Sequence, residues 1–171
     1  MTDNLYKSQY NAEEIRLMSY GQYFGPQAPV LPMEPLQMID GIEHVSLEGG
    51  AYGKGQVIAT LSIDHDNWFF KCHFINDPVM PGCLGLDGMW QTLGFFLAWN
   101  KFEGRARALG VNELKFTGQV EQSTKQIRYK IDIKRLVDMK LKMVVADGML
   151  EADGQEKYFA SNIRVGLFAR E

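Results

Sequence analysis

The chain has 171 residues, of which 46% are hydrophobic and 23% are charged, and its formal net charge is -3. This size fits a single domain spanning residues 1–171, in which roughly 70% of the unfolded surface becomes buried. The slight negative charge argues against nucleic-acid binding, because neutralising phosphate groups requires a basic face.

The first third of the chain predicts one short helix, an irregular segment and a strand. Asn11 and Glu14 have the spacing of a capping box, which predicts a helix that ends before Gly21. Residues 25–35 contain four prolines and predict an irregular segment that lies across the surface. Residues 52–63 predict a strand, because the apolar residues on one face alternate with others: Val57, Ala59, Leu61 and Ile63.

Residues 83–100 predict the one strong helix of the chain. Its apolar residues cover every direction around the axis, whereas a surface helix would keep a polar stripe. Such a helix must be surrounded on nearly all sides. Because the rest of the chain reads mostly as antiparallel strands, we expect an α+β protein in which an antiparallel sheet is wrapped around one long central apolar helix.

Four further strands are predicted after this helix. Residues 109–120 show a less regular pattern, whereas residues 127–133 alternate strictly and predict a half-buried antiparallel strand. Residues 141–152 and 155–168 predict a hairpin joined by the Asp153-Gly154 turn.

The cysteine content and the apolar runs bear on the compartment. Cys72 and Cys83 are too few for a disulfide framework, and residues 1–20 contain no apolar core of a secretory signal. The apolar run without charge that follows Asp87, residues 88–100, is too short to span a bilayer. We therefore expect a cytoplasmic protein that does not enter a membrane.

The segment CHFINDPVMPGCLGLDGMWQ, residues 72–91, combines the parts of an acid/base site. Asp87 is the only ionisable residue in the apolar helix, apart from the Cys83 thiol in its first turn, and desolvation there raises a carboxyl pKa so that the group can donate a proton. His73 is a candidate general base, and Gln91, one turn after Asp87, could orient the carboxyl. The helix start at Gly82 would supply N–H donors for a developing enolate oxygen.

Other interpretations of these residues remain open. A buried aspartate can be a structural acceptor, and a histidine can be a satisfied core residue. Cys83 lies in the first helical turn, where His73 could activate it as a nucleophile, although cysteine is also a common packing residue. A metal site of His65, Cys72, His73 and Asp87 is disfavoured, because adjacent residues of a strand point to opposite faces. We expect no metal and no other cofactor.

The segment WFFKCHFINDPVMPGCLGLDGMWQ, residues 68–91, resembles the bacterial 3-hydroxydecanoyl-acyl-carrier-protein dehydratase/isomerase family of type II fatty acid synthesis. Similar stretches are LPMEPLQMID (31–40), RALGVNELKFTGQV (107–120) and SNIRVGLF (161–168). The resemblance implies a hot-dog fold and a homodimer with shared active sites. It also implies that His73 and Asp87 of opposite subunits form one site, in which the Gly82 N–H polarises the thioester carbonyl.

The chemistry that this resemblance implies is dehydration of a (3R)-3-hydroxyacyl thioester of about ten carbons on acyl carrier protein. His73 would remove the C2 proton and Asp87 would assist departure of the 3-hydroxyl, with isomerisation of the trans-2 to the cis-3 product. Related dehydratases without isomerase activity carry glutamate at the aspartate position, so Asp87 favours the bifunctional branch. The alternatives are a plain dehydratase, a hot-dog thioesterase and a non-catalytic acyl-binding module.

Two larger sets of residues complete the expected site. The apolar candidates for an acyl tunnel, which ordinary core packing explains equally well, are Phe74, Met89, Trp90, Phe95 and Phe96. An acidic carrier protein requires a basic patch, for which the candidates are Lys134, Arg135, Lys140, Lys142 and Arg164. An ordinary solvated face explains the same charges.

Overall fold

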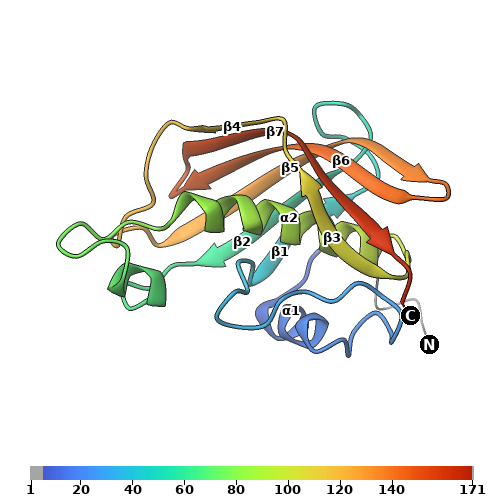
Figure 1. Ribbon diagram of the computed structural model, residues 1–171, viewed down its shortest axis with the longest axis horizontal. Helices are drawn as coiled ribbons and strands as arrows, with labels where there is room; N and C mark the ends of the chain where they lie inside the picture. The colour runs from blue at the N-terminus through green and yellow to red at the C-terminus, as the bar shows by residue number, and fades with distance from the viewer. Residues whose placement is uncertain (1–5, 171) are drawn as a thin grey trace.

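A seven-stranded antiparallel sheet curves around one long helix in the computed structural model, which describes residues 6–170 (Figure 1). The elements in chain order are α1 (Ala12–Ser19), β1 (Gly41–Ser46), β2 (Gln56–Ser62), the 3-10 helix η1 (Trp68–Lys71), α2 (Gly82–Trp99), β3 (Arg105–Gly110), β4 (Glu113–Phe116), β5 (Gln126–Asp138), β6 (Lys142–Ala152) and β7 (Gln155–Phe168). The strand order is β1-β2-β5-β6-β7-β3, with β4 also paired to β7. The predicted α+β hot-dog architecture is confirmed.

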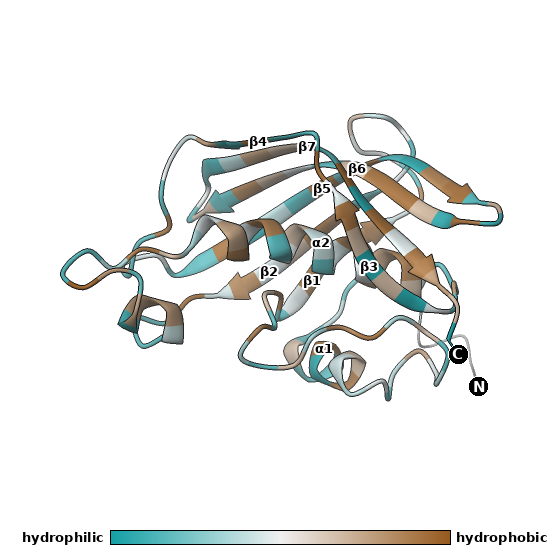
Figure 2. Cartoon of the chain, viewed as in Figure 1, coloured by the Kyte–Doolittle hydropathy of each residue, from teal (hydrophilic) through white to brown (hydrophobic). Residues whose placement is uncertain are grey.

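The three long strands form the centre of the sheet because their apolar residues alternate. Residues 127, 129, 131 and 133 of β5 are all buried, and bands of apolar and polar residues follow one another along the strands (Figure 2). β6 and β7 form the predicted hairpin. Asp153 and Gly154 at its turn both have positive φ, 48° and 79°, as a two-residue hairpin connection requires.

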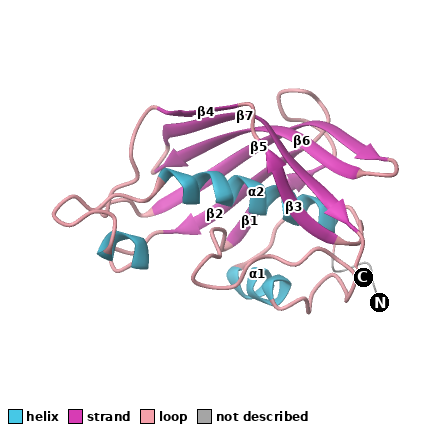
Figure 3. Cartoon of the chain, in the orientation of Figure 1, coloured by secondary structure: helices cyan, strands magenta, loops and turns pink. Residues whose placement is uncertain are grey.

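Helix α2 lies against the concave face of the sheet, and most of its residues are buried (Figure 3). Glycines let the sheet approach the helix closely. A Cβ atom at Gly85 would lie 2.5 Å from the Tyr158 ring, and one at Gly88 would lie 2.3 Å from the Tyr129 ring. The sheet and the N-terminal segment cover the helix on most sides, which explains why its sequence is hydrophobic all round.

The N-terminal segment holds the other end of α2 in place. Asn11 and Glu14 form the predicted capping box of α1, with both hydrogen bonds at 3.0 Å. Trp99 at the end of α2 donates its Nε1–H to the Lys7 carbonyl at 2.8 Å, and the buried Tyr10 ring meets the Phe95 ring edge-on. The segment thus packs on the core through aromatic contacts.

Three features differ from the expectations. The predicted strand 52–63 begins only at Gln56, because Gly53 and Gly55 adopt positive φ in a turn. The irregular strand 109–120 is divided, since Gly110 at φ 148° ends β3 before β4 begins. Strand β1 was not predicted, and a register shift between Ile42 and His44 explains why its sequence shows no clean alternation. Within residues 6–170, no helix is long and apolar enough to cross a membrane.

Candidate active site

The loop between η1 and α2 contains His73, and this loop lies at the end of the molecule where α2 begins (Figure 1). The backbone fixes this residue, because its N–H donates to the Phe69 carbonyl and its carbonyl accepts from the Val79 N–H, both at 2.9 Å. The ring Nδ1 lies 2.9 Å from the Val79 carbonyl oxygen. Since a carbonyl can only accept, Nδ1 carries the proton, and in the neutral ring Nε2 keeps a free lone pair. The partly buried ring is thus prepared to accept a proton at Nε2.

Asp87 lies in the second turn of α2 and has one side-chain partner in the described structure. Gln91, one turn later, donates from Nε2 to Asp87 Oδ2 at 2.6 Å. Burial raises the pKa of Asp87, and the hydrogen bond from Gln91 opposes part of that rise. The direction agrees with the expectation that the carboxyl can serve as a proton donor.

A cavity of about 270 Å³ opens next to Asp87, between α2, β3 and the irregular segment. Its lining is mostly apolar and small, and comprises Val30, Leu31, Pro32, Asp87, Trp90, Gln91, Gly94, Ala106, Arg107, Ala108 and Val165. The residues from the irregular segment and Arg107 were not predicted as site residues. The sequence marked them only by position. Leu31, Pro32 and Arg107 lie in stretches that carry the family resemblance, and Val30 directly precedes one of these stretches.

The raised pKa of Asp87 predicts how the substitution Asp87→Asn changes stability with pH. The folded state holds the proton more tightly than the unfolded state, so stability falls as pH rises from the ordinary value of 3.8 through the raised pKa, and then stays lower. Asparagine removes the buried carboxylate. We therefore expect Asp87→Asn to have a higher Tm than the parent at pH 7 and an equal Tm below about pH 4. Thermal unfolding between pH 3 and pH 8 checks this, and a constant difference at every pH would contradict it.

The start of α2 has no side-chain cap. Pro81 at the N-cap gives no side-chain hydrogen bond to the first turn, so the helix dipole is not compensated there. Gly82 lies close to the Phe116 ring, because a Cβ atom at this position would be 2.5 Å from it. Cys83 follows with its side chain exposed. The predicted role of the Gly82 N–H is therefore compatible with the backbone geometry.

In the described part of one chain, His73 and Asp87 are not in direct contact. No hydrogen bond or ion pair joins them in residues 6–170, and His73 does not line the cavity beside Asp87. The four residues of the metal interpretation do not form one group in the described structure: His65 lies with Asp64 and Asp66 in an exposed group that does not include Cys72, His73 or Asp87.

The five tunnel candidates occupy three different environments. Met89, Phe95 and Phe96 are at most 1% exposed and belong to the central core. Trp90 is partly buried and lines the cavity next to Asp87. Phe74 is 55% exposed, with its ring 3.8 Å from the His73 ring. Of this set, Trp90 and Phe74 are placed closest to the proposed chemistry.

The basic candidates are also placed differently. Lys134 is paired with Asp147 at 3.2 Å and lies over the Tyr52 ring, and Lys142 is paired with Asp138 at 3.7 Å. Arg135 and Lys140 are exposed, whereas Arg164 is partly buried and donates to Asn112. Arg135 and Arg164 both pair with Val145 of β6, so they lie in one row across three strands.

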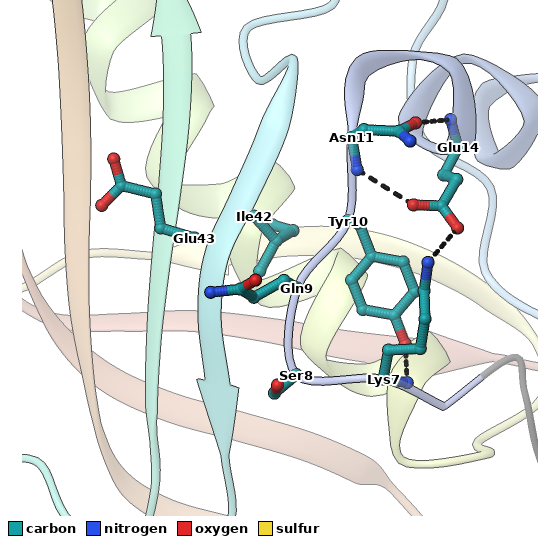
Figure 4. Close-up of a pocket in the computed structure, with 8 residues that line it drawn as sticks. All are labelled: Lys7, Ser8, Gln9, Tyr10, Asn11, Glu14, Ile42 and Glu43. Atoms are coloured by element: carbon teal, nitrogen blue, oxygen red, sulfur yellow. Dashed lines mark hydrogen bonds and ion pairs between the residues drawn. The ribbon is translucent and has the colours of Figure 1, made fainter.

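A separate hollow of about 630 Å³ lies between residues 7–14 and β1 (Figure 4). Its charged side chains are already paired. Lys7 forms an ion pair with Glu14, and Glu43 forms one with Arg128 at 2.8 Å. The N-terminal segment itself is attached to β1 by two backbone hydrogen bonds between Tyr10 and Ile42, both at 2.9 Å, which gives this hollow a structural role.

Comparisons with known proteins agree with this architecture. Residues 31–161 match the model of a protein family described as FabA-like domain. Among solved structures, the dehydratase heterocomplex ApeI:P from Xenorhabdus doucetiae matches with a TM-score of 0.62 and 16% identity, covering 82% of this chain and 89% of that one. S. sahachiroi AziG matches with a TM-score of 0.53 and 10% identity, covering 75% and 90% of the two chains. At these identities, the two structures show a shared fold.

Proposed function

This chain belongs to the FabA-like domain family, and on that premise we propose that it dehydrates 3-hydroxyacyl thioesters carried by acyl carrier protein. The observation that supports the proposal most is the pair of complementary groups at residues 73 and 87. One is an imidazole whose Nε2 is free to accept a proton, and the other is a carboxyl whose pKa is raised by burial. Storage of an acyl chain requires neither group.

In the proposed dehydration, His73 and Asp87 carry out different proton transfers. His73 Nε2 takes the proton from C2, and the electrons of the C2–H bond form the C2–C3 double bond as the C3–O bond breaks. Asp87 gives its proton to the departing hydroxyl, which leaves as water. The Gly82 N–H, at the positive end of α2, stabilises the enolate-like thioester oxygen. Proton exchange with solvent then restores both side chains.

We infer that a second copy of the chain completes the site, because His73 and Asp87 are not in direct contact within the described residues and His73 does not line the cavity beside Asp87. In the described sheet, β3 pairs only with β7, so its other edge is free to pair with a partner. This edge adjoins the cavity that holds Asp87, to which β3 contributes Ala106 and Ala108. We infer a homodimer in which the His73 loop of one subunit serves the Asp87 cavity of the other.

Isomerisation and carrier binding form the finer part of the proposal. In isomerisation, His73 would take a proton from C4 and return one to C2, which moves the double bond to C3–C4 as the cis isomer. Binding of the carrier protein is supported by the row of Arg135 and Arg164 across the sheet. Lys140 is exposed in the turn between β5 and β6. Clustered cations of this kind suit an acidic partner.

The test is to incubate the protein with (3R)-3-hydroxydecanoyl acyl carrier protein and to identify the products by mass spectrometry and double-bond position. We expect the trans-2 product together with the cis-3 product and no free thiol. A trans-2 product alone would reduce the assignment to a plain dehydratase. Release of free carrier thiol would indicate a thioesterase, and saturable binding without turnover would indicate an acyl-binding module.

A further inference from the structure

The side chain of Gln91 connects the candidate acid to a distant part of the chain. Gln91 is 5% exposed, and its Oε1 accepts the Met38 N–H at 2.8 Å. Its Nε2 donates to the Leu36 carbonyl at 2.7 Å and to Asp87 Oδ2 at 2.6 Å. Both N–H groups and the oxygen of one amide are therefore used, two contacts by the backbone and one by the carboxyl.

The backbone fixes which way this amide points. Rotating it by half a turn would place Oε1 against two acceptors and Nε2 against the Met38 N–H, which can only donate. The orientation is thus imposed by residues 36 and 38, and the amide then directs an N–H toward Asp87 Oδ2. Because Oδ2 is engaged in this way, Oδ1 is the oxygen left to carry the transferable proton.

The same segment forms one wall of the cavity beside Asp87. Val30, Leu31 and Pro32 face the cavity, and the chain then runs through residues 33–38 to the anchor at Gln91. Leu31 and Met38 are buried at 6% and 2% exposure, and Trp68 Nε1 also donates to the Pro35 carbonyl. A displacement of this segment would therefore change the cavity wall and the amide together.

We propose that Gln91 is a positioning residue that attaches the segment 30–38 to α2. The position of the cavity wall relative to the Asp87 carboxyl is thereby fixed. This inference rests on the proposed function for the role of Asp87 as an acid, but the coupling itself is a property of the fold. Other groups near Asp87 are Arg107 from β3 and the Tyr129 phenol from β5, whereas residues 30–32 contribute no titratable group.

The test compares Gln91→Met, which keeps the length of the side chain and removes its hydrogen bonds, with the parent protein. Hydrogen exchange of the Met38 amide is expected to become about tenfold faster, because a buried hydrogen bond is lost. The Asp87 carboxyl, followed by ¹³C NMR, is expected to titrate at higher pH, since the carboxylate loses a donor. Parental values for both would overturn the proposal.

Two further variants separate the coupling from a general loss of stability. Thr92→Val is the matched control, because Thr92 is buried on the same helix and donates only to the Gly88 carbonyl in the described structure. It should leave Met38 exchange and the Asp87 titration unchanged. Gln91→Glu keeps an acceptor for the Met38 N–H, so Met38 should stay protected while residues 87 and 91 titrate as a coupled pair. Loss of Met38 protection in Thr92→Val would overturn the proposal.

Activity provides an independent measurement. In Gln91→Met, the fall of kcat for dehydration at alkaline pH should move to higher pH, because the acid keeps its proton longer. If the NMR titration moves and the activity profile does not, the coupling stands and the role of Asp87 as the acid fails. The two proposals are thus tested separately.

Discussion

Replacing His73 with asparagine is expected to lower kcat for dehydration by about 10²–10⁴-fold, because the variant has no group that can accept the C2 proton. An asparagine amide can still donate to the Val79 carbonyl, which the parental ring contacts at 2.9 Å, so the loop should keep its conformation. Formation of the conjugated enoyl thioester, followed by its ultraviolet absorbance, measures the rate. An unchanged Tm shows that the loss is chemical, and turnover at the parental rate would contradict the assignment.

A mixture of two inactive chains tests whether each site is shared. Asp87→Asn should also be inactive, since its amide cannot release a proton to the leaving hydroxyl. When His73→Asn and Asp87→Asn chains are expressed together, about half of a two-fold dimer population is mixed. Each mixed dimer then has one intact site and one doubly altered site. The mixture should recover about a quarter of the parental activity.

The same mixture excludes a site within one chain. If His73 and Asp87 of the same copy acted together, every site in a mixed dimer would carry one substitution, and no activity would return. The matched control is a chain with both substitutions expressed together with the parental chain. Its mixed dimers have one substitution in each shared site, so they should be inactive under the proposed arrangement.

The sequence predicted the elements whose patterns depend only on local periodicity. The all-round apolar character of residues 83–100 required an enclosing sheet, and the alternation in residues 127–133 required a half-buried strand; both are confirmed. Strand β1 was missed because its register shift removes the alternation that would mark it. The break at Gly110 was missed because the conformational freedom of glycine is used only when the neighbouring strands require it.

The candidate site was predictable as residue types and not as contacts. The Asp87–Gln91 spacing along the helix foretold their hydrogen bond, which the structure contains at 2.6 Å. The attachment of Gln91 to Leu36 and Met38 could not be foreseen, because those residues lie more than 50 positions earlier in the chain. In the same way, an aromatic residue in an apolar helix does not reveal whether it faces the core or an acyl chain. Only the packing distinguishes Phe95 from Trp90.

Phe95→Ala is expected to lower the free energy of unfolding by about 3–5 kcal/mol, the range for removing a buried aromatic side chain. Phe95 is 1% exposed, and its ring lies 5.2 Å from the Tyr10 ring and 6.2 Å from the Phe24 ring, centroid to centroid. The substitution would thus leave a cavity between α2 and the N-terminal segment. Denaturant unfolding at one fixed protein concentration measures the loss, because the stability of a dimer depends on concentration.

The comparison with Phe74→Ala decides between core packing and an acyl tunnel. Phe74 is 55% exposed, so its removal should change the free energy of unfolding by no more than about 0.5 kcal/mol. Its ring lies 3.8 Å from that of His73, so the effect should fall on kcat or KM instead. If Phe95 only fills the core, Phe95→Ala loses stability and its relative rates on eight-, ten- and twelve-carbon substrates stay parental. A shift of that preference toward longer chains, with little loss of stability, would show that Phe95 contacts the acyl chain.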